Sequence, residues 1–146
     1  MIIRKCNLED LNKVTDLFDQ YRVFYGQKSD TTSAIRFIEE RLSAEDSVIF
    51  LAFDEKNNPA GFTQLYPSFS SVGMKKIWIL NDLFVSKNYR RQGVAKLLMA
   101  KAVSHTIQTG RSKLVLETGE NNLEAQQLYE SLGWTKEKTL NYEFSV

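Results

Sequence analysis

Residues 89–95 are Tyr89-Arg90-Arg91-Gln92-Gly93-Val94-Ala95, a short basic loop with one glycine. The apolar stretch before the loop, Ile77 to Val85, predicts a strand, and the apolar residues after it have helical spacing. A glycine at such a junction lets the backbone approach a ligand closely, and the first turn of a helix offers unpaired N–H groups at the positive end of its dipole. This arrangement favours binding of a pyrophosphate.

The charge of the loop agrees with that prediction. Arg90, Arg91 and Lys96 bring positive charge to it, and a guanidinium can donate two hydrogen bonds to one phosphate. The alternative interpretation is a solvated basic loop that only caps a helix. The loop has neither the Gly-Lys-Ser/Thr ending of a Walker loop nor the three spaced glycines of a dinucleotide fold.

Outward from this loop, apolar spacing and turn residues divide the chain into alternating short elements. The predicted order β-α-α-β-β-β-α-β-α-β-β indicates a mixed sheet covered by helices, an α/β domain in three layers. The expected helices begin near Asn7, Asp30, Val94 and Asn122, and the expected strands lie at Ile2–Ile3, Ser47–Phe53, Gly61–Tyr66, Ile77–Val85, Lys113–Thr118 and, once or twice, within Trp134–Val146.

Length and composition predict one domain over residues 1–146, because 42% hydrophobic residues suffice for a core at this size. With 19 basic and 18 acidic residues, the net charge of +1 gives no global field for nucleic acid or an anionic membrane. The single cysteine, Cys6, allows no intrachain disulfide, and Met1 to Cys6 lacks the apolar stretch of a secretory signal. No apolar run approaches the roughly 20 residues that span a bilayer. We therefore expect a cytoplasmic protein.

The loop also resembles a family signature. Arg90-Arg91-Gln92-Gly93-Val94-Ala95 is similar to the coenzyme A motif of the GNAT superfamily of N-acetyltransferases, in which Gly follows Arg or Gln by three residues and Gly or Ala follows two further on. Leu80–Val85 and Asn122–Trp134 resemble the blocks that flank this motif in the family, in the same order and spacing. The resemblance is closest to the diamine and the yeast histone and polyamine acetyltransferases.

This resemblance implies the GNAT acyl-CoA N-acyltransferase fold, with about six or seven strands and about four helices. It also implies transfer of an acetyl group from acetyl-CoA to an amine without a metal. The backbone of Leu83, Phe84 and Val85 would lie along the pantetheine arm like an added strand. The remaining coenzyme-binding residues that it implies are Arg90, Arg91, Gln92, Gly93, Val94, Ala95, Lys96, Asn122 and Ala125. Asn122 is at the same time a candidate helix N-cap.

For catalysis, the resemblance implies that Tyr129 is the general acid for the departing thiolate. A phenol with a pKa of about 10 keeps its proton at neutral pH and can donate it to sulfur. The diamine acetyltransferases carry a glutamate where this chain has Asn81, and an amide cannot act as a base. On a regular strand Asp82 would face away from Asn81, so we expect Glu117 or a chain of waters to take the proton from the amine.

The acceptor is expected to meet an aromatic and polar wall that includes Tyr25, Gln64 and Tyr66, with Asn81 beside it. Ordinary packing of these aromatic residues is the alternative. The sequence leaves the acceptor open between a small-molecule amine or amino acid and a peptide or protein amine. It also leaves open a non-catalytic acyl-CoA sensor, whereas an RNA-binding module would need a broader basic face. Exchange of Trp134–Val146 between subunits would give a homodimer.

Overall fold

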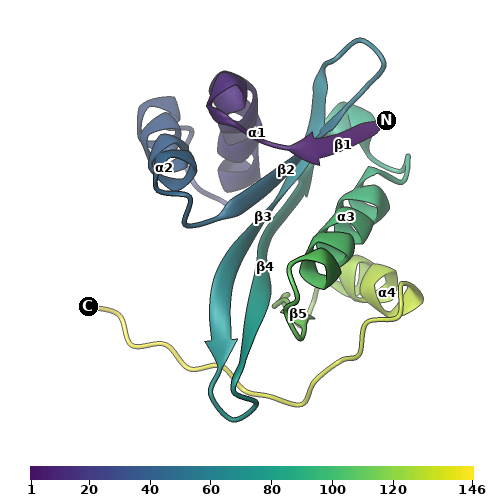
Figure 1. The fold of residues 1–146 in the computed structure, drawn as a ribbon. Helices are drawn as coiled ribbons and strands as arrows, with labels where there is room; N and C mark the ends of the chain where they lie inside the picture. The colour runs from purple at the N-terminus through teal and green to yellow at the C-terminus, as the bar shows by residue number, and fades with distance from the viewer. The chain divides into compact units, whose positions relative to one another are not determined.

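The computed structural model describes residues 1–146 as two compact units, Met1–Leu116 and Glu117–Val146 (Figure 1). The first unit contains a sheet with the strand order β1-β2-β3-β4-β5. Strands β1 to β4 are antiparallel to their neighbours and β5 is parallel to β4, which confirms the mixed sheet. Its elements are β1 (Ile2–Lys5), the 3₁₀ helix η1 (Leu8–Asp10), α1 (Leu11–Phe24), α2 (Thr31–Ala44), β2 (Val48–Phe53), β3 (Pro59–Ser70), β4 (Lys75–Val85), the 3₁₀ helix η2 (Lys87–Tyr89), α3 (Val94–Gln108) and β5 (Leu114–Val115).

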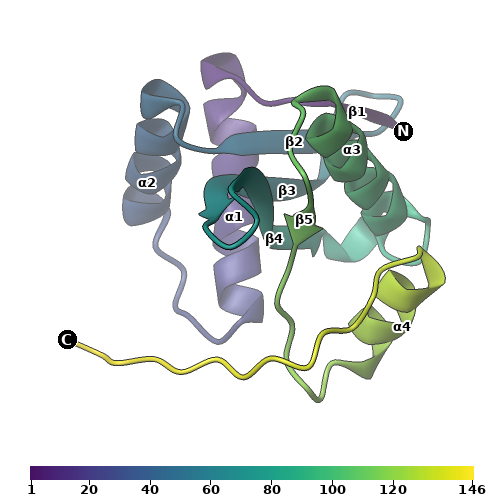
Figure 2. The same cartoon turned by 60° about the horizontal axis from the view of Figure 1, so that its bottom comes forward.

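Helices cover both faces of this sheet: α1 and α2 lie on one face and α3 on the other (Figures 1 and 2). All six residues of β2 are buried, as expected for a strand between two helical layers. The core under α1 and α2 is apolar and rich in aromatic rings. It includes Val14, Leu17, Phe18, Ala34, Ile38, Leu51, Phe53, Phe62 and Phe84.

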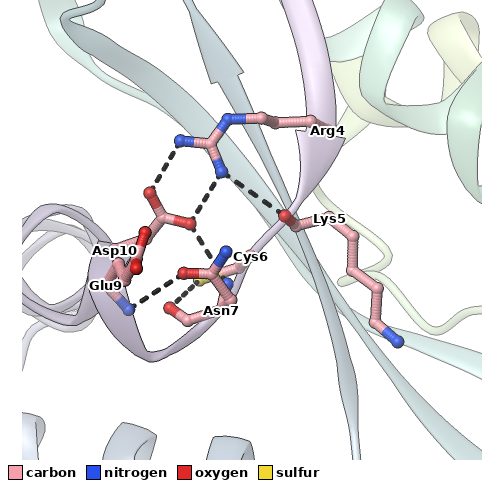
Figure 3. Close-up of polar contacts among 6 residues, drawn as sticks. All are labelled: Arg4, Lys5, Cys6, Asn7, Glu9 and Asp10. Carbon is pink, nitrogen blue, oxygen red and sulfur yellow. Dashed lines mark hydrogen bonds and ion pairs between the residues drawn. The ribbon is translucent and has the colours of Figure 1, made fainter.

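A bidentate ion pair joins β1 to the start of the first helices (Figure 3). Both Nη atoms of Arg4 donate to the Asp10 carboxylate at 2.7 Å, and the Asn7 backbone N–H donates to the same carboxylate at 3.1 Å. The side chain of Asn7 in turn accepts from the N–H of Glu9, which completes a capping box. Hydrogen bonding to Arg4 holds the pKa of Asp10 below its usual range.

This ion pair gives a stability prediction. Asp10→Asn should lower the free energy of unfolding at pH 7 by about 1.5–3 kcal/mol, the range for a hydrogen bond to a charged group. A lowered carboxyl pKa stabilises the fold above the unfolded value of about 3.9, and this contribution is lost as the pH falls through the folded-state pKa. Urea unfolding at pH 7 and pH 3 measures both points. An equal difference between parent and variant at the two pH values would contradict this origin.

The second unit contains one helix, α4 (Leu123–Ser131), capped by Asn122. Residues 134–146 form neither helix nor strand, so the prediction of one or two closing strands is wrong and the sheet has five strands. The expected strand at Lys113–Thr118 is likewise reduced to β5. Leu140, Tyr142 and Phe144 alternate as a strand would but are more than four-fifths exposed. Alternation alone makes no strand, because the backbone also needs a paired neighbour.

Candidate active site

A β-bulge interrupts β4 where the sequence predicted the acceptor side of the site. Leu80 pairs with Leu65 and Asp82 pairs with Gln64, so Asn81 is the extra residue on β4. A bulge breaks the alternation of side chains across a strand. The Nδ2 atom of Asn81 accordingly donates to Oδ1 of Asp82 at 3.1 Å. The prediction that Asp82 faces away from Asn81 is therefore wrong.

The Asp82 carboxylate ends a chain of buried polar side chains. Oδ2 of Asp82 accepts from Nε2 of Gln64 at 2.6 Å, and Oε1 of Gln64 accepts from the hydroxyl of Ser47 at 2.9 Å. Gln64 is fully buried and Asp82 is 3% exposed. Gln64 was expected in the wall of the acceptor site. Instead it is buried and donates a hydrogen bond to the Asp82 carboxylate. No local pattern in the sequence predicts this contact, because it depends on strand register.

The Asp82 carboxylate affects the pKa of two tyrosine side chains. Burial, together with the charge and hydrogen bonding of Asp82, raises the pKa of Tyr21 on α1. Burial and the charge of Asp82 raise the pKa of Tyr66 on β3 to about 12. Both hydroxyls therefore stay protonated over the physiological pH range. The ring of Tyr21 meets the ring of Tyr25 edge to face at 5.0 Å, and Tyr25 itself is 60% exposed. Tyr21 thus contacts Tyr25, one of the residues predicted for the acceptor wall.

The far half of β4 has an open edge. Pairing with β5 ends at Ile79 and Val115, so β4 has no strand partner on that side from Leu80 to Val85. Phe84 is buried, whereas Leu83 and Val85 are half-buried. A strand edge of this kind can pair with the amides of an extended ligand. The geometry fits the role that the family resemblance implies for these three residues.

The loop after β4 leads into the N-terminus of α3. Arg91 and Gly93 have left-handed backbones, with φ of 62° and 79°. A non-glycine residue in this region costs roughly 1–2 kcal/mol, and such strain clusters at functional sites. Gly93 is the N-cap of α3 and supplies no side-chain hydrogen bond, so no side chain caps the first N–H groups of the helix. A Cβ added at Gly93 would meet no atom within 4 Å, so the space above the loop is open.

Arg90 turns toward β4. Its Nε donates to the carbonyl of Val85 at 3.1 Å, and its guanidinium lies over the rings of Phe24 and Phe84, at 5.1 and 5.7 Å from their centroids. A cation over aromatic faces is held by their electron density. The residue therefore connects the end of α1 to the end of β4 in addition to adding charge to the loop.

A hydrogen bond from the Tyr89 side chain anchors the start of the loop. Its hydroxyl donates to Oδ2 of Asp54 at 2.7 Å, in the turn between β2 and β3. Hydrogen bonds from Asn58, with further bonds from Tyr89 and the backbone of Lys56, lower the pKa of Asp54 to about 2. The carboxylate therefore stays ionised and remains an acceptor for Tyr89. Sequence analysis missed this contact, since the two residues are 35 positions apart.

The second unit carries the other predicted residues. Asn122 caps α4, because its Oδ1 accepts from the N–H of Ala125 at 3.3 Å, so the cap interpretation is confirmed. Tyr129 is half-buried in the same helix, with its ring centroid 6.2 Å from that of Trp134. Glu117 is exposed at the beginning of the unit.

Two surface depressions lie away from these residues. Depressions along α1 and α2, lined for example by Ile35 and Arg36, contain none of the predicted site residues. No three His, Cys, Asp or Glu side chains come together as a metal site. None of the helices combines the length and the apolar character that a membrane span requires.

A mixed sheet with an open strand edge, followed by an uncapped helix start, is the arrangement expected of an acyl-CoA-dependent transferase. Residues 11–134 match the family model for the acetyltransferase (GNAT) family, and the chain belongs to this family. It is 43% identical over 137 residues to the uncharacterized N-acetyltransferase YhfO of Bacillus subtilis, covering 94% of this chain and 91% of the relative. The crystal structure of a probable acetyltransferase, 40% identical, superimposes with a TM-score of 0.94 over 100% of this chain and 98% of the other. A D-amino-acid N-acetyltransferase of Saccharomyces cerevisiae is 28% identical, over 75% of this chain and 67% of its own length.

These comparisons confirm the GNAT fold and the acetyltransferase activity expected from the sequence, with acetyl-CoA as the cosubstrate of the family. The protein is an acetyltransferase of the GNAT family.

Proposed function

We propose that the protein transfers the acetyl group of acetyl-CoA to a primary amine of a small molecule or amino acid, by direct attack in a ternary complex. Two consecutive features of the first unit support the proposal that the protein binds acetyl-CoA. The open edge of β4 offers backbone groups to the pantetheine arm, and the uncapped start of α3 follows after the left-handed turn at Arg91 and Gly93. Helix N-termini with exposed N–H groups favour phosphate binding.

The proposed reaction has three steps. A proton leaves the ammonium group of the acceptor, through water or Glu117, and the neutral nitrogen attacks the thioester carbonyl. The carbon–sulfur bond then breaks as the amide forms, and Tyr129 donates a proton to the leaving thiolate. A second proton leaves the nitrogen for solvent, and solvent returns one proton to the Tyr129 phenolate, so the net products are an N-acetyl amide, a free thiol and one proton. Proximity within one complex lowers the barrier because neither reactant must be brought in from solution.

Several features support a small acceptor. Tyr25 and the half-buried Tyr66 provide aromatic side chains, and Asn81 is exposed on the bulge, where it donates a hydrogen bond to Asp82. The yeast relative is named for an amino acid substrate. We also propose that residues 1–146 act as one cytoplasmic N-acetyltransferase domain, and that the 134–146 segment pairs two copies in a homodimer.

The test of this function is thiol release from acetyl-CoA across a panel of amines. The panel should contain alkyl amines, polyamines, D- and L-amino acids, aminoglycosides and peptides with free N-termini. We expect the highest kcat/KM for a small primary amine. Faster turnover of peptides than of small amines would replace the small-molecule proposal with peptide acetylation. If no amine of the panel causes thiol release from acetyl-CoA, the proposed function is wrong.

Position 81 carries an amide, and the neighbouring Asp82 carboxylate is buried and already accepts hydrogen bonds from Gln64 and Asn81, so we expect kcat/KM to depend strongly on pH. An alkyl ammonium has a pKa of about 10, so only about one molecule in a thousand is neutral at pH 7. We expect kcat/KM to rise with pH well above 7. Asn81→Glu supplies a nearby proton acceptor and should move the rising limb to lower pH, whereas Glu117→Gln should move it to higher pH. The measurement is kcat/KM from about pH 6 to 10, and superimposable profiles in all three proteins would withdraw both residues from proton transfer.

A further inference from the structure

His105 on α3 is the one histidine of the chain, and no step of the proposed reaction uses it. Its ring packs against the rings of Phe50 on β2 and Trp78 on β4, with centroid distances of 5.3 and 5.2 Å. Both of these partner rings are buried. The Nε2 atom of His105 is buried as well, and it has no hydrogen-bond partner. One nitrogen of a titratable ring is thus shielded from solvent.

The charges that act on this ring are all positive. They come from Lys5 on β1, Lys101 on α3 and Arg111 in the turn after α3, and no charged residue of β2 or β4 acts on the ring. Burial, together with these three cations, holds the pKa of His105 below its ordinary value of 6.5. The imidazole is therefore neutral at pH 7.

The aromatic faces next to His105 are already occupied by other cations. The guanidinium of Arg111 lies 4.1 Å from the ring centroid of Trp78, and the ammonium of Lys101 lies 5.7 Å from that of Phe50. A protonated His105 would also carry an N–H at Nε2 without an acceptor, and an unsatisfied charged donor is especially costly. The dipole of α3 favours a cation in its last turn, but burial and three like charges outweigh it.

Few contacts hold the segment after His105 to β4. Nε1 of Trp78 donates to the hydroxyl of Thr109 at 2.9 Å, and this hydroxyl donates to the carbonyl of His105 at 2.7 Å. Nη1 of Arg111 donates to the carbonyl of Ile77 at 3.1 Å, and β5 contributes only two residues to the sheet. Segments with few contacts open at a lower free energy than the whole fold. A charge placed at His105 would therefore act on a weakly held part of the structure.

We propose that His105 is a pH-sensitive switch, which holds residues 105–115 against β4 while its ring is neutral and releases them when the ring is protonated. The release is local, because the three repelling cations surround this segment and not the core under α1 and α2. Since the folded-state pKa is lowered, the segment is fully held above about pH 6.5 and is released as the pH falls below that value. This segment includes β5, after which the chain continues into the second unit.

Proton NMR tests the titration directly, because a single histidine gives resonances that need no assignment. We expect a midpoint below pH 6.5 in the folded parent. Lys5→Gln changes an exposed residue and removes the strongest of the repelling charges, so it should raise the midpoint. Lys13→Gln is the matched control, since Lys13 also lies over a buried ring, 5.2 Å from the centroid of Phe53, but does not act on His105. A parent midpoint at or above pH 6.5 would overturn the switch.

Hydrogen exchange tests the release itself. Peptides from residues 105–115 and from β2 are compared at pH 7.5 and 5.5, after correction for the intrinsic effect of pH on exchange. In the parent, protection of residues 105–115 should fall at the lower pH, by up to about 10-fold for each unit by which the midpoint lies below 6.5, and β2 should keep its protection. His105→Phe keeps a ring between Phe50 and Trp78 but cannot titrate, so its protection should be equal at both pH values.

Three exchange results would contradict the switch. The first is equal protection of residues 105–115 at both pH values in the parent, and the second is the same acid-dependent loss in His105→Phe. The third is an equal loss in β2, which would mean that the whole fold opens. His105→Gln, which is also neutral, replaces the phenylalanine variant if that variant does not fold. Neither experiment uses acetyl-CoA or an amine, so both results are independent of the proposed function.

Discussion

Replacing Tyr129 with phenylalanine should lower kcat about 10²- to 10⁴-fold with acetyl-CoA and the best amine of the panel, the usual contribution of a general acid. The phenyl ring keeps the contact with Trp134, whose ring centroid lies 6.2 Å away, and only the hydroxyl is lost. The affinity for acetyl-CoA should therefore stay within a factor of about two. Steady-state kinetics measures the fall in kcat, and calorimetry measures the affinity.

The matched control for this prediction is Tyr142→Phe. Tyr142 is 91% exposed in the 134–146 segment, so the same loss of a hydroxyl there should leave kcat unchanged. A more basic leaving group depends more on protonation. Replacing acetyl-CoA with an acyl donor that has a more acidic thiol should therefore reduce the difference in kcat between the parent and Tyr129→Phe. Full turnover by Tyr129→Phe would show that water or another group protonates the thiolate.

Gly93→Asp should weaken the binding of acetyl-CoA about 100-fold or more. The added carboxylate would stand at the start of α3, where the N–H groups and the positive dipole end are expected to meet the pyrophosphate, and charge-assisted hydrogen bonds of this kind are the strong ones. The variant should still fold, because an added Cβ meets no atom within 4 Å and an aspartate is favourable at a helix N-terminus. Calorimetric titration with acetyl-CoA measures the loss.

Gly110→Asp provides the control at the other end of the same helix. Gly110 also has a left-handed backbone, with φ of 66° against 79° at Gly93, and also has no atom within 4 Å of an added Cβ. The two variants therefore share the backbone strain and the added charge, and they differ in position. Gly110→Asp should bind acetyl-CoA like the parent. Equal affinities in the two variants would remove the loop from the pyrophosphate site.

Much of the fold follows from local signals in the sequence. The helix at α3 was predicted because apolar spacing begins directly after Gly93, and the helix at α4 because Asn122 can cap it, a role that the hydrogen bond to Ala125 confirms. These signals lie within a few residues of each other, so no knowledge of the tertiary structure is needed. The closing strands predicted within Trp134–Val146 are absent for the opposite reason, since a strand exists only with its partner.

The acceptor side of the site was decided by the tertiary structure. The sequence suggested that Asp82 faces away from Asn81, and the bulge opposite Gln64 and Leu65 reversed this. Nothing local to β4 marks the bulge, because it is a mismatch in register between two strands. The Asp54 carboxylate beneath Tyr89 was hidden for the same reason.

The sequence by itself therefore determined the family of this protein, the order of its elements through α4 and the loop expected to hold the coenzyme. The family and the loop follow from Leu80–Val85, Arg90–Ala95 and Asn122–Trp134, and the order of the elements follows from the spacing of apolar side chains. Only the tertiary structure decided which side chains surround the proposed acceptor position, because the hydrogen-bonded chain of Ser47, Gln64 and Asp82 joins three separate parts of the sequence. Such contacts depend on strand register and on burial, and both arise when distant segments pack together.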